Sequence, residues 1–426
     1  MKRKKPIIHL AGIQIGVCSG IVILILLAYL PTFSGDFLLD DHPLIADNPL
    51  IRDLQPLPWY FLQEDGVLSK TEVAGGYHTG YYRPLISLTY QLDYKLWGLA
   101  PMGFRLTNLI LHLAVCLMLY LILKAHQTGI FVSFAVVAFF GLHPVNTEAV
   151  SWISSRNNIL VALFSLAGYY FYTTPGRARP LINRGLSVLF FAAALFSKEF
   201  AIMLLPILFL YNRFRKGKPM SRAGEWLGYL PFVAVLTVYL YLRHQALGGE
   251  GMSPAHSLLF RLFATPFIIL YYLRLLVFPV GLHNFYVSYP EQILSAEILI
   301  GICGLLLVTF LIFRSPRGSR LRWGAVVFIL GLAPVLNIVQ TASPSLVSMR
   351  WAYFPFVFLC TVFAGLGFGR SGASRVWWAV PILFGLWLGG YTHYLNSRHW
   401  QNNAVLFKRE VALHANAYYY GGLAET

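Results

Sequence analysis

Charged side chains are scarce in this sequence of 426 residues, of which only 12% are Asp, Glu, Lys or Arg and 57% are hydrophobic. A chain this apolar cannot cover its surface with groups that water solvates, so the composition excludes a water-soluble globular protein. Many apolar runs reach the ~20 residues that a helix needs to cross a bilayer. The sequence therefore predicts an integral membrane protein surrounded by membrane lipid.

Cysteine is scarce as well, and its positions carry no pattern. Cys18, Cys116, Cys303 and Cys360 all fall inside apolar runs, without the spacing of a disulfide framework or a zinc site, so we expect core residues. The sequence also lacks a glycine-rich phosphate loop and any other ATP-binding motif. These absences argue against an ATP-driven pump.

Basic residues outnumber acidic ones and give a net charge of +16. They occur in short clusters between apolar runs, which is the pattern of a positive-inside topology and not of a nucleic-acid-binding surface. The cluster at residues 2–5 precedes the first apolar run, so we predict a cytoplasmic N-terminus. The chain is expected in a bacterial inner membrane, or in the ER membrane of a eukaryote, with its functional side periplasmic or lumenal.

The apolar runs predict an all-α polytopic fold with about 11 transmembrane helices. The run over residues 8–30 is longer than the core of a signal peptide, so we interpret it as an uncleaved first span. The run over 263–278 is interpreted as re-entrant or interfacial, because a twelfth span would place the basic cluster at 314–322 outside. We divide the chain into a transmembrane domain, residues 1–395, and an external tail, residues 396–426.

Acidic residues gather in the first external loop, about residues 32–103, which is long enough to carry amphipathic helices. Nine of the 17 acids lie there: Asp36, Asp40, Asp41, Asp47, Asp53, Glu64, Asp65, Glu72 and Asp93. The Asp40-Asp41 pair directly follows the first span. Neighbouring carboxylates raise the pKa of one of the two, which suits a general base or a metal ligand. The alternative is a solvated turn before Pro43, and we expect most of the other seven acids on the surface.

Lys198 and Glu199 lie between two basic turns that are close in sequence. A helical hairpin between those turns is too short to cross a hydrocarbon core of ~30 Å, so both charges should lie below the outer surface. Charges at that depth must be paired or must line a wet cavity. We expect the external loop to roof this cavity.

A dense polar run begins at His143. On a helix that begins near Thr147, Glu148, Trp152 and Arg156 would share one face, because they recur every four residues. An acid and a base on that face could clamp a phosphate. They could equally form an intrahelical stack behind a Thr147 cap.

Two arginines, Arg83 and Arg350, stand at the outer ends of expected helices. The guanidinium fork matches phosphate geometry, so both could hold an anionic donor at the outer leaflet. Snorkelling to lipid headgroups is the alternative. Asn108 and His112 lie one helical turn apart inside a span, where such pairs most often join helices.

In this order the motifs resemble a known family. The collinear residues are Asp40-Asp41 with Asn48, Tyr82-Arg83-Pro84-Leu85, Asn108 with His112, His143-Pro144 through Thr147-Glu148-Ala149-Val150, Lys198-Glu199, and Arg350 with Tyr353 and Pro355. They cover about residues 35–360. They are similar to the transmembrane and tetratricopeptide-repeat protein O-mannosyltransferases and their bacterial relatives, which are membrane glycosyltransferases of the GT-C fold.

The resemblance implies a sugar donor carried on a polyprenyl phosphate and an acceptor hydroxyl, of a protein or a glycan, on the external side. Asp40 or Asp41 would be the general base of an inverting transfer of mannose or a similar hexose. Lys198 and the two arginines would neutralise the leaving phosphate. The candidates for binding the donor are Arg83, His143, Glu148, Arg156, Lys198, Glu199 and Arg350. A divalent metal could bind at the acid pair, and no other cofactor is expected.

Two features depart from the family pattern. Met349 stands where the family often has an acid, so the partner of Arg350 must differ. Residues 413–418 could form one helix of a tetratricopeptide repeat, but a single repeat cannot bury its own face. The identity of a protein acceptor therefore does not follow from the sequence.

A transporter or flippase of lipid-linked sugars is the alternative function, because it would also need intramembrane charges and a long external loop. Such folds usually carry internal repeats, which the sequence does not show. A scaffold without activity is a third hypothesis, and it would bind no donor.

Overall fold

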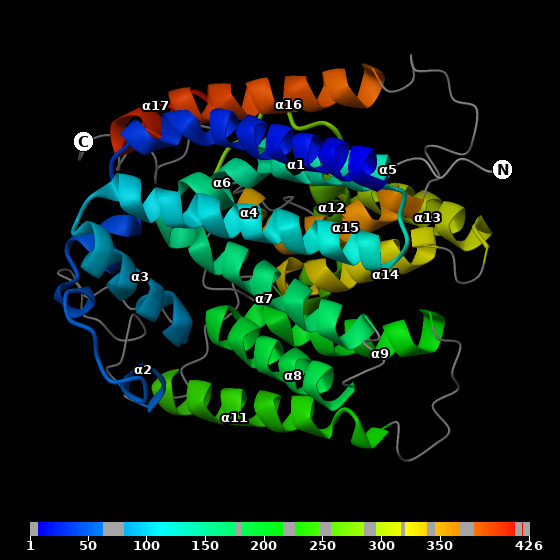
Figure 1. Ribbon diagram of the computed structural model, residues 1–426, viewed down its shortest axis with the longest axis horizontal. Helices are drawn as coiled ribbons and strands as arrows, with labels where there is room; N and C mark the ends of the chain where they lie inside the picture. The colour runs from blue at the N-terminus through cyan, green and yellow to red at the C-terminus, as the bar shows by residue number, and fades with distance from the viewer. Residues whose placement is uncertain are drawn as a thin grey trace.

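A computed structural model describes residues 7–62, 81–174, 180–215, 226–247, 257–284, 295–316, 320–338, 346–365, 379–413 and 420. All regular secondary-structure elements within these residues are helices, which confirms the predicted all-α class. The α-helices are α1 Ile7–Tyr29, α2 Trp59–Leu62, α3 Pro84–Trp97, α4 Pro101–Ala125, α5 Ile130–Gly141, α6 Thr147–Ser151, α7 Arg156–Thr173, α8 Pro180–Ser197, α9 Leu204–Arg215, α11 Leu230–Leu247, α12 Leu258–Val277, α13 Ala296–Arg314, α14 Arg320–Leu332, α15 Met349–Gly365, α16 Ala379–Arg398 and α17 Asn403–Leu413. Many of the long helices lie side by side along one direction (Figure 1).

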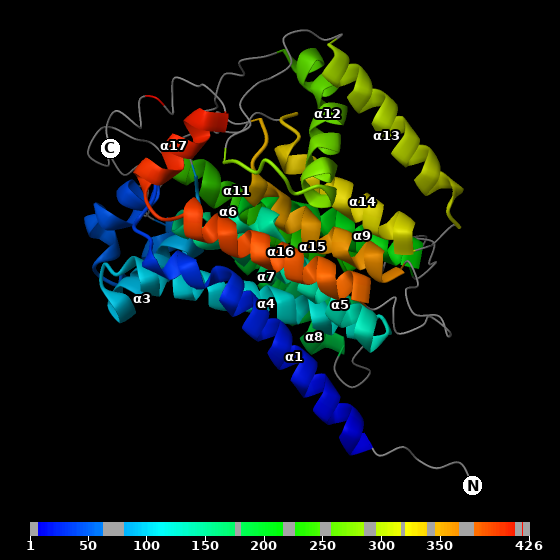
Figure 2. The ribbon, with the colours of Figure 1, turned by 90° about the horizontal axis from the view of Figure 1, so that it is seen from above.

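Six described helices are long and apolar enough to cross a membrane, and α5 with the helical segment after it forms a seventh candidate that is bent by 47°. Other helices could also cross the membrane although they are too short or too polar to be recognised by length and hydropathy. α7 begins with the polar residues Arg156, Asn157 and Asn158, and α15 has only 17 residues, yet both lie largely buried. The total of about 11 spans stays a prediction. The N-terminal part of α1 stands away from the bundle (Figure 2).

The direction of α12 bears on the segment at 263–278, which we interpreted as re-entrant. By length and composition α12 is a candidate span. However, it runs parallel to α13, because Gly301 approaches the backbone of Phe267 and Gly304 approaches the side chain of Leu270. Both helices begin at the same end of the pair (Figure 2). Successive spans must run in opposite directions, so the parallel pair supports the re-entrant interpretation.

The first external loop contains short helices that precede and follow its acid pair. A 3-10 helix at Leu30–Ser34 and a π-helix at His42–Ala46 flank Asp40 and Asp41, and α2 and α3 follow. α3 packs against α4 and α8 and exposes Leu92 and Leu96. An apolar exposed side is what an interfacial amphipathic helix presents to lipid, so the predicted amphipathic character holds for α3.

Most of the described acids of the loop outside the pair are exposed, as predicted for Asp36, Asp47 and Asp53. Glu64, Asp65 and Glu72 lie outside the described residues. Asp93 is the exception, because it is buried with 3% of its surface exposed. Its position on the inner side of α3 is explained by a buried partner.

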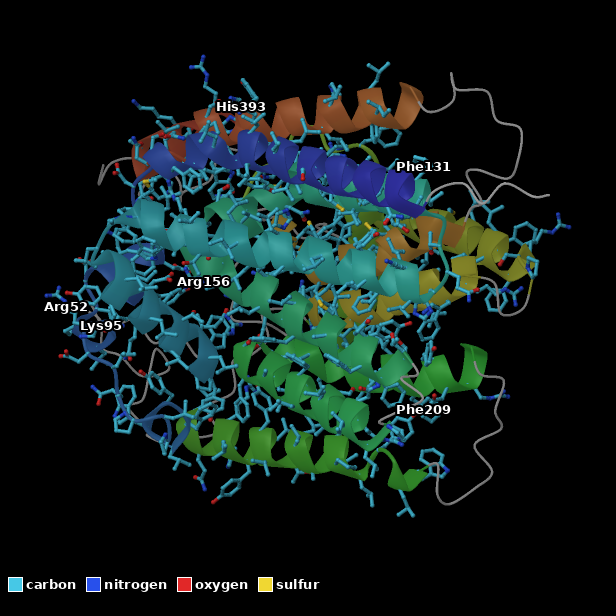
Figure 3. The ribbon with its side chains drawn as sticks, viewed as in Figure 1. Arg52, Lys95, Phe131, Arg156, Phe209 and His393 are labelled. Atoms are coloured by element: carbon cyan, nitrogen blue, oxygen red, sulfur yellow. The ribbon has the colours of Figure 1, made fainter. Side chains whose placement is uncertain are left out.

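That partner is Arg156, the first residue of α7. Its Nη2 donates to Asp93 Oδ2 at 2.5 Å, and its Nε donates to Asn108 Oδ1 at 2.7 Å. Thr107 Oγ1 donates to the other oxygen of Asp93 at 2.7 Å. Arg156 is fully buried at the start of α7, where Figure 3 labels it. The network joins α3, α4 and α7, so it favours a role of Arg156 in helix packing.

Two of the cysteines depart from the expected core positions. Cys116 and Cys360 are buried, but Cys18 and Cys303 are exposed. They lie on α1 and α13. Only 22% of the apolar stretch of α1 and 11% of that of α13 is buried inside the protein. Both helices are candidate spans, so their exposed apolar sides face lipid and not water. An apolar run predicts an apolar environment but not a place in the protein core.

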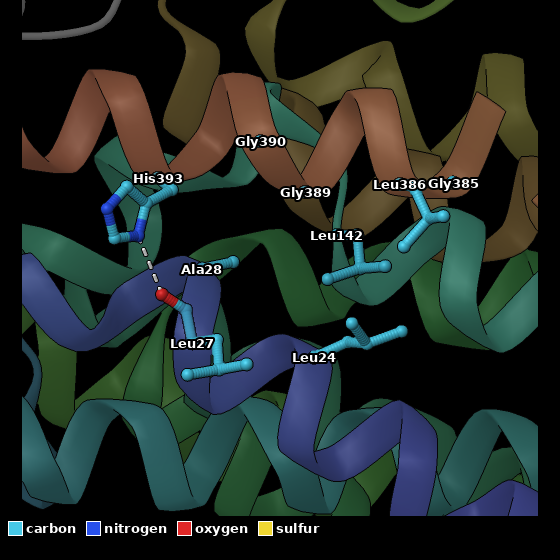
Figure 4. Close-up of a pocket in the computed structure, with 9 residues that line it drawn as sticks. All are labelled: Leu24, Leu27, Ala28, Leu142, Gly385, Leu386, Gly389, Gly390 and His393. Atoms are coloured by element: carbon cyan, nitrogen blue, oxygen red, sulfur yellow. Dashed lines mark hydrogen bonds between the residues drawn. The ribbon is translucent and has the colours of Figure 1, made fainter. Parts of the chain in front are cut away.

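A groove runs between α1 and α16 (Figure 4). It is lined by Leu24, Leu27, Ala28, Leu142, Gly385, Leu386, Gly389, Gly390 and His393. Its one titratable lining group is His393, whose Nδ1 lies 2.8 Å from the carbonyl oxygen of Leu27. A phosphate would find no charged partner there, so the groove is not the predicted donor site.

The Asp93–Arg156 pair generates a stability prediction. Asp93→Leu and Arg156→Met each leave a buried charge without its partner, so each should lower the free energy of unfolding by about 3–5 kcal/mol. The double variant buries no unpaired charge and should be more stable than either single variant. Thermal unfolding of the detergent-purified protein measures this.

Lys95→Met is the matched control, because Lys95 is exposed and lies 3.6 Å from an exposed Asp53. Its effect should stay within about 0.5 kcal/mol. Losses in the double variant that equal the sum of the two single losses would show that the pair is not coupled.

Candidate active site

Helix ends and helix breaks bring six of the predicted site residues near one another. Arg350 influences the ionisation of Asp40, and Arg83, Glu199, Arg350 and Glu148 influence that of Lys198. These residues come from the loop after α1, the start of α3, α6, the segment directly after α8 and the start of α15. We call the group the charged cluster; its members are Asp40, Arg83, Glu148, Lys198, Glu199 and Arg350. Arg156 and His143 have other partners.

Asp41 is fully buried and holds the first external loop to the segment after α6. Its Oδ2 accepts a hydrogen bond from Leu38 N at 3.0 Å, and its Oδ1 accepts one from Ser154 N at 2.7 Å. Burial raises the pKa of Asp41 to about 6, although both hydrogen bonds oppose this shift. Each carboxylate oxygen already has an amide donor. Asp41 is therefore suited to fixing the loop.

Asp40 differs from its neighbour in both exposure and partners. It is only half-buried, and its carboxylate accepts no hydrogen bond from any residue in the described part of the chain. Burial raises the pKa of Asp40, and the positive charge of Arg350 opposes that shift. A carboxylate with open acceptor positions beside a cation can take a proton from a bound hydroxyl.

Glu148 and Arg350 form a buried ion pair across α6 and α15. Glu148 Oε2 also accepts a hydrogen bond from the backbone N of Arg350 at 2.8 Å, and Ser348 Oγ donates to Glu148 Oε1 at 3.0 Å. The carboxylate therefore receives donors on both oxygens. This answers the question that Met349 raised in the sequence, because an acid some 200 positions upstream supplies the partner of Arg350.

The predicted common face of Glu148, Trp152 and Arg156 is wrong. α6 ends at Ser151, Trp152 has extended backbone angles (φ −85°, ψ 116°), and α7 begins only at Arg156. The break turns Glu148 toward α15 and Arg156 toward α3 and α4. The alternative, a Thr147 cap, is also absent, because the Thr147 Oγ1 donates backwards to Pro144 O at 2.8 Å. Glu148 and Arg156 thus form two separate ion pairs and do not share one helix face.

Arg83 and Glu199 form a second ion pair, which has two contacts. Arg83 Nη2 donates to Glu199 Oε1 at 2.8 Å, and Arg83 Nε donates to Glu199 Oε2 at 3.3 Å. Burial alone would raise the pKa of Glu199, but the charges of Arg83 and Lys198 outweigh burial and lower it to about 2. The pair ties the first external loop to the residue that follows Lys198.

Lys198 is the buried lysine of the charged cluster, and its hydrogen-bond partner is a neutral side chain. Its Nζ donates to Asn158 Oδ1 at 2.5 Å, and 3% of the residue is exposed. Burial, reinforced by the charge of Arg83, holds the pKa of Lys198 well below its usual value. A phosphate beside the amine would favour its charged form. Lys198 therefore fits an anion better than the paired arginines do.

The two histidines of the motifs connect parts of the fold. His143 Nε2 lies 3.1 Å from Leu276 O at the end of α12, and its Nδ1 accepts a hydrogen bond from Val145 N at 3.3 Å. His112 Nδ1 lies 2.6 Å from the hydroxyl of Tyr353. His112 and Asn108 thus join helices as predicted. For His143, which we predicted to bind the donor, these contacts favour a structural role.

Sequence reasoning missed several residues that shape the site. Ser348 and Asn158 complete the surroundings of Glu148 and Lys198. Arg105 is fully buried and donates to the carbonyl oxygens of Thr32 and Asp36, in the loop that leads to Asp40. Arg105 was detectable, because a base near an apolar run needs a partner. The neutral residues carry no such signal.

The acid pair does not form a shared ligand set in the described residues. Asp41 uses its two oxygens on backbone amides, which leaves Asp40 as the available carboxylate. No group of three or more His, Cys, Asp or Glu is close enough to hold a metal ion in the part of the chain that is described. Divalent metals bind several oxygen ligands, so this pair alone does not make a site.

The raised pKa of Asp41 generates a prediction on stability. A carboxyl with a pKa of about 6 when folded and ~4 when unfolded binds its proton more tightly in the folded state. Its stabilising contribution is therefore present below pH ~4 and falls by up to ~3 kcal/mol as the pH rises through 6. The Tm of the wild type minus that of Asp41→Asn should fall between pH 4 and pH 7. A difference that stays constant across this range would contradict the assignment.

Comparison with known proteins places these motifs in context. No protein-family model matches the sequence. The chain is 26% identical, over 80% of its length and 50% of the relative, to protein O-mannosyl-transferase F38B6.6 of Caenorhabditis elegans. It is 30% identical to protein O-mannosyl-transferase TMTC1 of Homo sapiens, over 47% of this chain and 24% of that protein.

Among solved structures, the crystal structure of ArnT from Cupriavidus metallidurans bound to undecaprenyl phosphate matches with a TM-score of 0.47 and 12% identity, over 98% of this chain and 70% of that chain. The chain spans half or less of the length of the curated relatives named above. Those curated homologues are TMTC-type protein O-mannosyltransferases, which confirms the resemblance that the collinear motifs indicate.

Proposed function

We propose that this chain is an inverting glycosyltransferase that moves mannose or a similar hexose from a polyprenyl-phosphate donor to an acceptor hydroxyl on the external side. The similarity to protein O-mannosyltransferases supports the transferase class. The observation that carries the proposal is the charged cluster itself. It combines a carboxylate with open acceptor positions, Asp40, with a buried lysine, Lys198, that has only a neutral hydrogen-bond partner.

On the acceptor side of the reaction, Asp40 is the general base. Its carboxylate takes the proton of the acceptor hydroxyl while the oxygen attacks the anomeric carbon of the sugar. The bond between that carbon and the phosphate oxygen breaks, and its electron pair leaves with the polyprenyl phosphate. Attack opposite the leaving group inverts the anomeric configuration. One glycosidic bond forms and one glycosyl phosphate bond breaks, so no further reactant is needed.

On the donor side, Lys198 is a better candidate than the two arginines for binding the phosphate. Arg83 is paired with Glu199 and Arg350 with Glu148, so the charge of each guanidinium is already compensated. Lys198 can instead exchange its contact with Asn158 for a phosphate oxygen. A cation there stabilises the negative charge that develops on the leaving phosphate. The arginines then hold the walls of the site.

Replacing Asp40 tests the proposed base. Asp40→Asn keeps the size of the side chain but cannot accept a proton, so kcat for transfer from a polyprenyl-phosphate sugar should fall by about 10²–10⁴-fold. Transfer of radiolabelled sugar in proteoliposomes measures this. Asp53→Asn, an exposed acid of the same loop, is the control and should keep wild-type activity.

Full activity in Asp40→Asn would remove Asp40 from the mechanism. Movement of labelled donor lipid across the liposome membrane, without a transfer product in the wild type, would instead support the transporter hypothesis.

Replacing Lys198 tests the phosphate contact. Lys198→Met keeps the apolar stem and removes the charge, so kcat should fall by at least about 10²-fold, whereas Lys198→Arg should retain part of the activity. Lys95→Met removes an exposed lysine and should be neutral. Equal activities of Lys198→Met and the wild type would show that the leaving phosphate is stabilised elsewhere.

A further inference from the structure

An unusual backbone conformation lies directly before the proposed base. Leu39 has a φ of +48°, in the left-handed region that residues with a branched side chain rarely adopt. Position 39 holds neither glycine nor asparagine, the residues that adopt this conformation most readily. A strained residue persists only where its surroundings hold it, and such residues gather at functional sites. What holds Leu39 therefore also fixes the direction of Asp40.

Two of the contacts that hold Leu39 come from α17, more than 360 positions along the chain. The amide of Leu39 donates to the side-chain oxygen of Asn403 at 3.0 Å. Phe407, one helical turn after Asn403, packs against the Leu39 side chain. One face of α17 thus supplies both a hydrogen bond and an apolar contact to this single residue.

α17 is anchored well enough to act as a fixed support. Asn402 caps its first turn, because its Oδ1 accepts a hydrogen bond from Val405 N at 2.9 Å. Just before the helix, the carbonyl oxygen of Gln401 accepts a hydrogen bond from Asp36 N at 2.7 Å. Further along, the fully buried Glu410 accepts one from Asn284 N at 3.1 Å. The described part of the predicted external tail is therefore packed onto the site; residues 414–418 lie outside the described residues.

We infer that Asn403 is a positioning residue, which holds Leu39 in its left-handed conformation and thereby aims the Asp40 carboxylate at the acceptor hydroxyl. The inference rests on the proposed function for the role of Asp40. Without the Asn403 oxygen, the Leu39 amide loses its partner and the strain at this residue is released by rotation of the backbone. Asp40 follows directly, so it moves while the donor contacts at Lys198 stay in place.

The experiment compares Asn403→Leu, which has a similar size but no acceptor, with Asn403→Asp, which keeps the acceptor oxygen. Asn403→Leu should lower kcat about 10–100-fold, because small displacements of a catalytic group are costly, and should leave the donor KM within about twofold. Asn403→Asp should recover most of the activity. Lys408→Ala, an exposed residue of the same helix, is the control and should behave as wild type.

A second substitution separates positioning from general destabilisation. Glycine adopts positive φ without strain, so Leu39→Gly combined with Asn403→Leu should regain at least about threefold in kcat over Asn403→Leu alone. A purely structural role of Asn403 would predict a further loss in the double variant. An unchanged kcat in Asn403→Leu, or a double variant no better than the single one, would overturn the inference.

Hydrogen exchange keeps this test independent of the proposed function. The Leu39 amide should exchange faster in Asn403→Leu than in the wild type and in Lys408→Ala, whether or not the protein transfers sugar. If the wild type transfers no sugar but this difference is present, the proposed function fails and the restraint on Leu39 stands. If exchange is the same in all three proteins, the restraint itself is wrong.

Discussion

The ion pair between Glu148 and Arg350 is the contact around which the site is arranged. Both oxygens of the buried Glu148 carboxylate have donors, which a charge removed from water requires. The Arg350 guanidinium lies 4.8 Å from the centre of the Trp152 ring. Trp152 Nε1 in turn donates to Leu38 O at 3.1 Å, next to the strained Leu39. A single buried charge thus connects α15 through the helix break to the loop of Asp40.

The helix break at Trp152 is what separates the functions of the polar run. A continuous helix would have placed Glu148 and Arg156 about two turns apart on one face, with Trp152 between them. With α6 ending at Ser151, each charge meets a partner from a distant helix. The pair of Arg156 then ties the helices together, and the pair of Glu148 supports the cluster. The break therefore gives each of the two charges its own long-range ion pair.

The sequence was sufficient for the fold class and for the burial of Lys198, because both follow from the cost of placing polar groups in an apolar surrounding. It was not sufficient for the pairing. Arg83 and Glu199 are 116 positions apart, and no local pattern distinguishes that partnership from a phosphate contact. Asp93 shows the same limit, since its loop is acidic and mostly exposed while its own partner is buried in α7. Neutral partners such as Asn158 and Asn403 leave no trace in composition or spacing.

The acid pair shows most clearly how two equal residues acquire different roles. Asp40 and Asp41 are adjacent and chemically identical, so sequence reasoning could only treat them as alternatives. In the fold, amides of Leu38 and Ser154 occupy Asp41, whereas Asp40 keeps its acceptor positions open and has Arg350 as its cationic neighbour. A residue bound on both oxygens would have to break a loop contact at each turnover in order to take a proton. Because backbone amides occupy both oxygens of Asp41, the proposed roles are a support for Asp41 and a base for Asp40, and not two carboxylates that share one proton.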